Sequence, residues 1–390
     1  MNKPTRIFGA ALAVSVLCIP PSLAQTPVKI GLITTLSTPG GYLGQDMQDA
    51  FNLAVKEENG KLGGVPVELV IADDGLNPNT AKDIAERMQQ RDKIKIFTGI
   101  IYTNITLAVV PDLLRNGAIV LSNNNGPREL DGKNCHPNFF ATGWHGEAPG
   151  ESAGAAALAT NSKNIVGIVA NYNSGLEQLG GFKRTFKLPL GDEILVKLNQ
   201  TDYAAEITRI KSKQPDGGYM FLPGGMGISF LRQLQQAKVP GLREFTATTV
   251  DGRVAQTIGE AAIDVVGSTI WSPDLDNATN KRFVAAFQEA YKRPPTVYAA
   301  VGYDTARLLG SALRSVNGDA SNTAGLRAAL RAAKFDSVRG KFSFGKSQYP
   351  IQDWYMTEAS KTSSGQVIHS VSKKLLTDFG SPYASQCTTN

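Results

Sequence analysis

The stretch from Lys29 to Pro78 constrains the fold of this chain more than any other. It opens with a short apolar run, KIGLITTLS, which is typical of a buried strand, and continues through a loop of small residues, TPGGYLGQD. From Met47 to Val55 apolar residues recur at i, i+3, i+4, i+7 and i+8, which predicts a helix with one apolar stripe. Asn59-Gly60 ends that helix, and GGVPVELVIADD predicts a second strand. Asn77 and Pro78 then predict the N-cap and the first residue of another helix. The unit is therefore the beginning of an open α/β sheet.

The same alternation of strands and helices continues along the chain in two successive series, which predicts two doubly wound lobes. We expect further strands at 94–99, 118–122 and 139–142 in the first series, and at 164–171, 193–198, 218–222, 244–248 and 265–271 in the second. We expect helices from Thr103 to Asn116, through 179–182 and 203–207, and at 228–237, 278–291, 298–316 and 323–332. The strand-like segments FSF and QDWYM come last, followed by a polar tail.

The opening segments, KIGLITTLSTPGGYLGQDMQDAFNLAVKEEN and then GGVPVELVIADD, resemble the branched-chain amino acid binding proteins. These are solute receptors of ABC importers with the type I periplasmic binding fold, and the resemblance extends with gaps from about residue 28 to about residue 354. It implies an α/β fold of two doubly wound parallel-sheet lobes joined by a three-strand hinge, with crossovers near 144, 272 and 348. The N-terminal lobe would then comprise 25–144 plus 273–347, and the C-terminal lobe and tail 145–272 plus 348–390.

Residues 1–24 have the pattern of a cleaved secretory signal peptide. Lys3 and Arg6 form a positive start, an apolar core follows at 7–19, and Ser22-Leu23-Ala24 is a small-x-small cleavage site. The apolar core is too short to span a bilayer. We therefore expect a protein that is exported to the periplasm.

Cys135 and Cys387 remain after such cleavage, in a compartment where disulfides persist. The tail after Trp354 is long enough to return to Cys135, so we predict a disulfide between the two. The formal net charge is +6, but Lys and Arg are scattered and form no cluster, which argues against nucleic acid as a partner. We expect a monomer.

No motif predicts an enzyme or a cofactor. Gly340 to Ser347 matches the phosphate-loop pattern GxxxxGK[ST], but Phe342 and Phe344 alternate as in a strand, and Tyr349-Pro350 stands where a helix should begin. The three histidines of the chain show no metal-ligand spacing. No GxSxG nucleophile elbow is present.

The candidate ligand-binding residues lie at the carboxyl ends of the expected strands, where open α/β sheets bind ligands. In the family, loops after the third and fourth strands hold the ligand carboxylate with hydroxyls, amides and a helix N-terminus, and an aromatic residue of the first loop acts as a lid. Two alternatives stay open: Thr103 merely caps its helix, and Trp144 is core packing. The expected residues are Tyr42, Tyr102, Thr103, Asn104, Asn124, Asn125, Trp144, His145, Tyr172, Asn173, Gly225, Met226, Thr249 and Asp251.

The resemblance also indicates the kind of ligand. Amino acid receptors bind the ligand ammonium with acidic residues, but this chain places Thr249 near the expected Glu and Gly146 near the expected Asp. The segments NYNSG, LPGGMG and CHPNFF resemble the branch of the family that receives aromatic acids. We therefore expect a benzoate- or cinnamate-type acid, and an ABC permease of the inner membrane as partner. If Asp251 rather than Thr249 faces the cleft, its carboxylate remains to bind the ammonium group of an amino acid. The alternatives are a receptor for branched-chain amino acids or amides, and a ligand-sensing regulatory domain.

Overall fold

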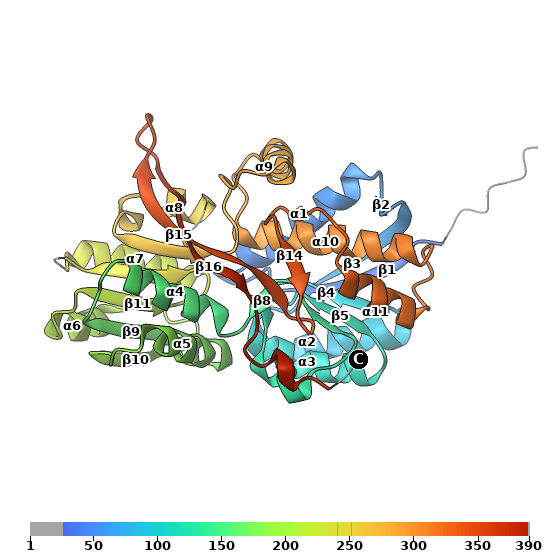
Figure 1. Cartoon of the computed structure of the whole chain (residues 1–390), viewed down its shortest axis with the longest axis horizontal. Coiled ribbons are helices and arrows are strands. Elements are labelled where there is room, and N and C mark those ends of the chain that lie inside the picture. Colours follow the sequence, from blue (N-terminus) through green and yellow to red (C-terminus); the bar gives the residue numbers. More distant parts are fainter. Residues whose placement is uncertain (1–25, 240, 251, 389–390) are drawn as a thin grey trace, which may run out of the picture.

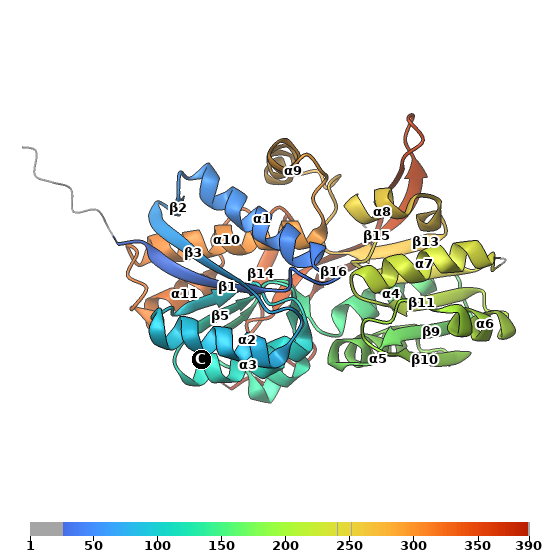
Figure 2. The same cartoon turned by 180° about the vertical axis from the view of Figure 1, so that it is seen from behind.

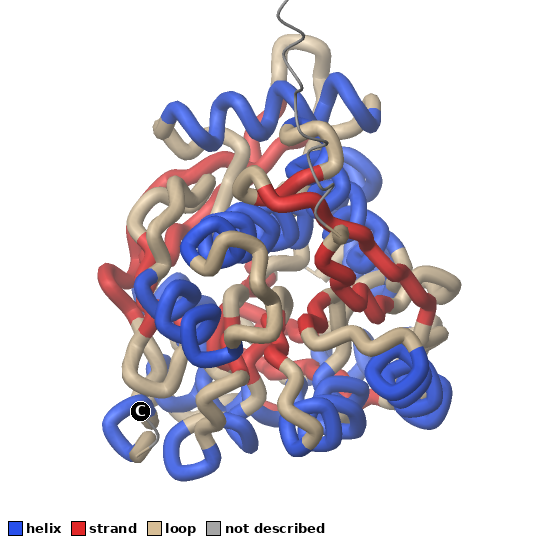
Figure 3. The backbone as a smooth tube through the Cα atoms, turned by 90° about the vertical axis from the view of Figure 1, so that its right-hand side faces the viewer, coloured by secondary structure: helices blue, strands red, loops and turns tan. Residues whose placement is uncertain are grey.

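Two parallel β-sheets lie side by side along the long axis of the molecule, one in each half (Figure 1). The computed structural model describes residues 26–239, 241–250 and 252–388, so the expected signal segment 1–24 and Asp251 lie outside the described residues. Helices flank the strands on either side (Figure 3). No helix in the described part of the chain has the length and hydropathy needed to cross a bilayer.

The first sheet has the order β2-β3-β1-β4-β5-β7, and the opening unit forms its centre. β1 pairs in parallel with both β3 and β4, while β2 runs antiparallel to β3. Asn77 caps α2 by accepting a hydrogen bond from the Asn79 amide at 2.9 Å, and Pro78 is the first helical residue, as predicted. The elements are β1 (Val28–Thr34), α1 (Tyr42–Glu57), β2 (Lys61–Leu62), β3 (Val65–Asp73), α2 (Pro78–Glu86), β4 (Ile96–Thr98), α3 (Thr103–Arg115), β5 (Ile119–Ser122) and β7 (Phe139–Ala141).

The second sheet has the order β10-β9-β11-β12-β13-β15-β14, and β16 pairs with β15. Its strands are parallel up to β13, after which β15 runs antiparallel to its neighbours. The elements are α4 (Ala148–Ala159), β9 (Ile165–Ala170), α5 (Asn173–Phe186), β10 (Asp192–Val196), α6 (Ala204–Ser212), β11 (Gly217–Phe221), α7 (Gly225–Ala237), β12 (Arg243–Ala247), α8 (Gly252–Ile258), β13 (Val265–Thr269), β14 (Phe342–Phe344), β15 (Pro350–Lys361) and β16 (Val367–Phe379).

Three helices after β13 return to the first sheet, as the resemblance implied. They are α9 (Ala278–Tyr291), α10 (Val297–Ser315) and α11 (Thr323–Ala332), and α10 lies along α1 (Figure 2). The contact is close, since a Cβ on Gly302 would stand only 2.5 Å from the Met47 carbonyl oxygen. The phenol of Tyr291 also donates a hydrogen bond to the Asp49 carbonyl oxygen at 2.6 Å. The expected fold of two parallel-sheet lobes is confirmed.

The elements not expected from the sequence include α4, α8 and the long strand β16. Ala, Gly and Ser fill α4, which is buried on most sides, so no polar face outlines an apolar stripe. A Cβ on Gly150 would lie 1.8 Å from the Gln178 carbonyl oxygen, so small residues are required where α4 meets α5. The tail expected to be irregular forms β16, whose alternating polar and apolar residues pair with β15.

The phosphate-loop match forms a strand and not a loop. Phe342–Phe344 is β14, which pairs antiparallel with the beginning of β15, and no helix follows it. The backbone amides of this segment therefore lack the strand-loop-helix geometry that surrounds phosphates. The expectation of a strand and turn is confirmed.

Cys135 and Cys387 form the predicted disulfide, with their Cα atoms 5.6 Å apart. The tail, which we expected in the C-terminal lobe, thereby ends against residues 131–135, which belong to the first half. The hydroxyl of Ser381 bonds Asp131 there, and the phenol of Tyr383 reaches Glu147 at 2.9 Å. The tail therefore connects both halves of the molecule behind the crossovers.

A buried arginine connects the crossovers. Arg339 pairs with Asp304 of α10 at 2.8 Å, and both side chains are at most 1% exposed. The same guanidinium donates to the Thr142 carbonyl oxygen at 2.9 Å and to Gln352 of β15 at 2.8 Å. One side chain thus fixes the ends of two crossover segments to a helix of the first lobe.

We expect replacement of both disulfide cysteines by serine to lower the free energy of unfolding by up to about 5 kcal/mol, because the disulfide closes a very long loop in the unfolded chain. Urea denaturation of the mature protein and of the C135S/C387S variant measures this difference. The mature protein should also titrate no free thiol in denaturant. Two reactive thiols per chain would contradict the disulfide.

We expect Arg339→Leu to lower the free energy of unfolding by about 3–5 kcal/mol, because the substitution leaves Asp304 buried without its cation. Arg209→Leu is the matched control: it breaks a pair with Asp192 in which Arg209 is half exposed, and should lower the stability far less, because solvent screens an exposed pair. Equal losses in the two variants, measured by urea denaturation, would show that the Arg339 pair has no special role.

Candidate ligand-binding cleft

A cavity lies where the carboxyl ends of the strands of the two sheets face each other. The first half contributes residues that follow β4, β5 and β7, and the second half residues that follow β9, β11 and β12. The lining residues are Leu43, Ile101, Tyr102, Asn124, Asn125, Trp144, Tyr172, Ser174, Gln178, Phe221, Pro223, Thr248 and Tyr298.

Two helices from opposite lobes begin at this cavity. Tyr102 precedes the first residue of α3, Tyr172 precedes the first residue of α5, and neither helix start has a side-chain cap. The alternative that Thr103 merely caps α3 is therefore not supported, since Thr103 is the first helical residue. Because uncapped amides and the helix dipole favour negative charge, the cavity lies between two anion-favouring helix ends.

Several polar atoms at the cavity are buried and unused. Thr103 Oγ1, Asn124 Oδ1, Asn125 Oδ1 and Gln178 Oε1 form no hydrogen bond with any described residue. The amide nitrogens of Asn124 and Asn125 both donate to the Ile101 carbonyl oxygen, which fixes their side chains. Buried polar atoms without partners are costly, so this set is suited to receive a polar ligand.

Aromatic rings supply the rest of the wall. The rings of Tyr102 and Tyr172, one from each lobe, have centroids 6.5 Å apart, and Tyr172 stacks on Phe221 at 6.2 Å and 19°. Trp144 meets Tyr298 edge to face at 6.3 Å. Burial, together with the nearby Asp74 carboxyl, raises the pKa of Tyr102 to about 12, so its phenol stays neutral and able to donate a hydrogen bond.

The two lobes touch across the cleft. Arg253 of α8 reaches the buried Asp46 of α1 at 3.3 Å and lies 5.7 Å from the centroid of the Tyr42 ring. A Cβ on Gly225 would stand 3.0 Å from Pro39, so the loops of both lobes are also in contact. The cavity has a volume of only about 20 Å³, which is about the space of one water molecule. The structure is therefore the closed form.

A second contact between the lobes involves two carboxyl groups. The Glu177 carboxylate on α5 accepts a hydrogen bond from the Arg128 amide at 3.1 Å, and Asn173 donates to Glu129 at 3.1 Å. Burial, and a side-chain hydrogen bond with Glu129, raise the pKa of Glu177 to about 9. At neutral pH Glu177 is therefore protonated, beside Glu129 of the other half.

The structure brings five of the expected ligand residues together at the cavity. They are Tyr102, Asn124, Asn125, Trp144 and Tyr172. Trp144 is 3% exposed and packs against Trp354 as well as Tyr298, so it belongs both to the core and to the cavity wall.

Other expected residues lie at the edge of the cleft. Tyr42 and Gly225 are the first residues of α1 and α7, which approach each other across the cleft. Asn173 bonds Glu129, and Thr103 and Asn104 are in the first turn of α3.

The structure places three expected residues away from the cavity, and Asp251 lies outside the described residues. Met226 is buried in the core of the second lobe, where its sulfur accepts a hydrogen bond from the Asn199 amide. Thr249 bonds Thr246 at 2.9 Å. His145 is buried 3.5 Å from Glu151, and burial and the charge of Arg184 lower its pKa to about 3. His145 is thus a neutral side chain packed beside Glu151 and Arg184, behind the cleft.

Sequence reasoning missed several cavity residues. Ser174 and Gln178 follow Tyr172-Asn173 within α5, and their i, i+4 spacing on the expected helix was a signal that could have found them. Tyr298 is the second residue of α10, a helix that the resemblance assigned to the first lobe without indicating that its beginning reaches the cleft. Only the packing of α10 against α1 brings Tyr298 to the cavity.

Two parallel-sheet lobes with a polar and aromatic cavity between facing strand ends define a bilobed ligand-binding protein of the type I periplasmic binding fold. The chain belongs to the periplasmic binding protein family, which it matches over residues 27–366. Among curated proteins it is 25% identical over 359 residues to the Leu/Ile/Val-binding protein BraC3 of Rhizobium johnstonii, covering 88% of this chain and 93% of that protein.

Solved structures show the same fold. A solute-binding protein of an ABC transporter from R. palustris, solved in complex with benzoate, has a TM-score of 0.88 and 27% identity, covering 93% of this chain and 100% of the other. A solute-binding protein from Rhodopseudomonas palustris BisB5, in complex with 3,4-dihydroxy benzoic acid, has a TM-score of 0.81 and 25% identity, covering 90% and 98%.

We expect the closed form to lose stability at high pH through Glu177. The pKa of Glu177 is about 9 in the folded protein and 4.5 in the unfolded chain. Its contribution to the free energy of unfolding is therefore complete below pH 4.5 and is lost as the pH rises through about 9. Each unit of difference between the two pKa values corresponds to about 1.4 kcal/mol. Urea denaturation should show the wild type losing stability relative to Glu177→Gln between pH 5 and pH 9.5. A difference between the two proteins that does not change with pH would contradict the raised pKa of Glu177.

Proposed function

We propose that this protein is the periplasmic solute receptor of an ABC importer and that it binds a small aromatic carboxylate of the benzoate or cinnamate type. The observation that carries the proposal is the chemistry of the cavity: two helix N-termini and neutral donors converge on it, and none of its described lining residues is charged. Such a site suits a carboxylate and supplies no counter-ion for an ammonium group.

The carboxylate would lie between the beginnings of α3 and α5. Backbone amides at both helix starts and the neutral phenol of Tyr102 are donors available there. Hydrogen bonds to a charged group contribute about 1.5–3 kcal/mol each. Because the donors come from both lobes, binding of the carboxylate would favour the closed form.

An α-amino group would find amide oxygens in the cavity but no carboxylate partner among its described lining residues. An unpaired buried ammonium costs several kcal/mol. Thr249 bonds Thr246, away from the cavity. Glu177 lies beside Gly146, where a Cβ would stand 1.8 Å from the Glu177 carboxyl, but its raised pKa keeps Glu177 protonated at neutral pH. Neither position therefore supplies the carboxylate that an amino acid requires.

The aromatic part of the ligand would contact Tyr102, Tyr172 and Trp144. A cavity that holds a benzene ring has a volume of about 150 Å³, far above the volume in this closed form. The ligand must therefore enter while the lobes are apart, and the tyrosine rings must separate to stack on it. Rotation about the crossovers near Arg339 is the motion that this requires.

The comparisons support this ligand class. Two of the similar solute-binding proteins carry benzoate and 3,4-dihydroxy benzoic acid. We propose export to the periplasm from the signal pattern of residues 1–24, and delivery of the ligand to a membrane permease by the closed form. A branched-chain amino acid is the second candidate ligand, because the curated relative is named a Leu/Ile/Val-binding protein.

In a thermal-shift panel of the mature protein, we expect benzoate, 4-hydroxybenzoate or cinnamate to raise the melting temperature, and leucine, isoleucine and valine to leave it unchanged. A ligand at one hundred times its dissociation constant adds about 2.7 kcal/mol to the folded state, which corresponds to at least about a degree or two. Tyr102→Phe should weaken the binding of the best acid about tenfold, since it removes one donor to the carboxylate.

Tyr219→Phe is the matched control, because the buried Tyr219 hydroxyl lies in the core of the second lobe without a partner among the described residues. This variant should bind the acid as the wild type does. A shift with leucine and with no aromatic acid would overturn the proposal. Loss of a leucine shift in Asp251→Asn would then identify Asp251 as the amine anchor.

A further inference from the structure

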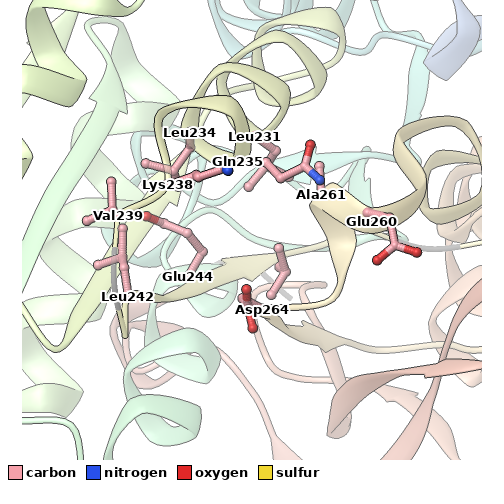
Figure 4. Close-up of a pocket in the computed structure, with 11 residues that line it drawn as sticks. Leu231, Leu234, Gln235, Lys238, Val239, Leu242, Glu244, Glu260, Ala261 and Asp264 are labelled. Carbon is pink, nitrogen blue, oxygen red and sulfur yellow. The ribbon is translucent and has the colours of Figure 1, made fainter.

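A second cavity, of about 220 Å³, lies in the C-terminal lobe at the opposite end of the sheet from the cleft. β12 connects the two places, since it begins at Arg243 beside this groove and ends at Ala247, next to Thr248 of the cleft. The groove lies between α7 and the 3-10 turn η4 (Gly259–Ala262), over the beginnings of β12 and β13. Its lining residues are Leu231, Leu234, Gln235, Lys238, Val239, Leu242, Glu244, Glu260, Ala261, Asp264 and Val265 (Figure 4).

Glu244 is the unusual residue of this groove. It is 2% exposed, and neither of its carboxyl oxygens forms a hydrogen bond with any described residue. Figure 4 shows its side chain beneath the side chains of α7. A Cβ on Gly218 of the neighbouring strand β11 would stand 2.1 Å from Glu244 Oε1, so a glycine makes the room that the carboxyl occupies.

A buried carboxyl without a partner is costly, and the cost is greatest when it is charged. Burial accordingly raises the pKa of Glu244 to about 8. The backbone of Glu244 is fixed by a hydrogen bond from its amide to the Asp264 carbonyl oxygen at 3.0 Å, which holds β12 against the beginning of β13. The missing partner is therefore a hydrogen-bond donor, and a cation would serve best.

The other lining residues define the shape and charge of that cation. Leu231, Leu234, Leu242 and Val265 are buried and apolar, so the wall favours an aliphatic group. Glu260 and Asp264 are exposed at the edge, where Glu260 pairs with Lys361 at 2.7 Å.

Lys238 is exposed and is the one basic residue among the described residues that line the groove. The acidic lining residues therefore outnumber the basic one. The His, Cys, Asp and Glu residues in the described part of the chain form no group of three suited to a metal ion.

We propose that the groove between α7 and η4 is a second binding site, separate from the cleft, for a small primary ammonium ion with a short aliphatic chain. The ammonium pairs with the Glu244 carboxylate, and the aliphatic chain packs on the leucines of α7. Because the site and the cleft lie at opposite ends of β12, both can be occupied together. The site does not depend on the identity of the cleft ligand.

Isothermal titration calorimetry of the mature protein with isoamylamine tests this proposal. We expect saturable binding of one amine per chain at pH 8, weakened about tenfold or more in Glu244→Gln, which keeps the shape of the side chain but removes its charge. Glu260→Gln, at the exposed edge, is the matched control and should change the affinity less than about threefold. Isoamyl alcohol, which has a similar chain and no charge, should not bind.

The pH dependence supplies a second readout that a merely apolar pocket would not give. Because Glu244 must lose its proton to pair with the ammonium, binding should tighten from pH 6 to pH 9 in the wild type and in Glu260→Gln, but not in Glu244→Gln. Lys238, Glu260 and Asp264 are the other charged residues that line the groove. Equal affinity in the wild type and in Glu244→Gln, equal binding of the alcohol, or no saturable binding would each overturn the proposal. Melting curves check that the variants are folded.

Discussion

The ion pair between Arg339 and Asp304 holds the connection between the lobes in place. Its guanidinium also bonds the Thr142 carbonyl oxygen and the side chain of Gln352, so one group fixes segments that are far apart in the chain. A buried charge tolerates little displacement, because separating the partners leaves each without compensation. The crossover segments are therefore fixed at the place about which the proposed rotation of the lobes would occur.

The contacts across the cleft are of a different kind. Arg253 with Asp46, and Glu177 with Glu129, are polar pairs formed by partly exposed residues as well as buried ones. Each of these contacts includes a partly exposed side chain, so opening the lobes would cost less than disrupting either core. The combination of a buried pivot and polar contacts at the cleft is what a protein needs if it is to open and close around a ligand.

Local sequence patterns predicted most elements because each of those elements is formed by interactions between residues close together in the chain. The apolar stripe of α1, the Asn77 cap with Pro78, and the alternating FSF segment of β14 all formed as expected. Patterns failed where burial removed the signal. α4 is buried on most sides by small residues, and β16 is ordered by pairing with β15, which lies earlier in the chain. The cavity was predicted only in part. The loops that follow the strands could be located from local patterns, but the directions of their side chains depend on tertiary packing and could not.

The sequence by itself determined the two series of strands and helices, the family, and the residues Tyr102, Asn124, Asn125, Trp144 and Tyr172 of the cavity, because strand ends are marked by local composition. Only the tertiary structure decided that Tyr298 and Gln178 also line the cavity and that Met226 and His145 do not. It also decided that the Glu244 carboxyl is buried without a hydrogen-bond partner among the described residues. Those outcomes depend on which helix packs against which strand, and on the exclusion of water between them, which no local pattern encodes.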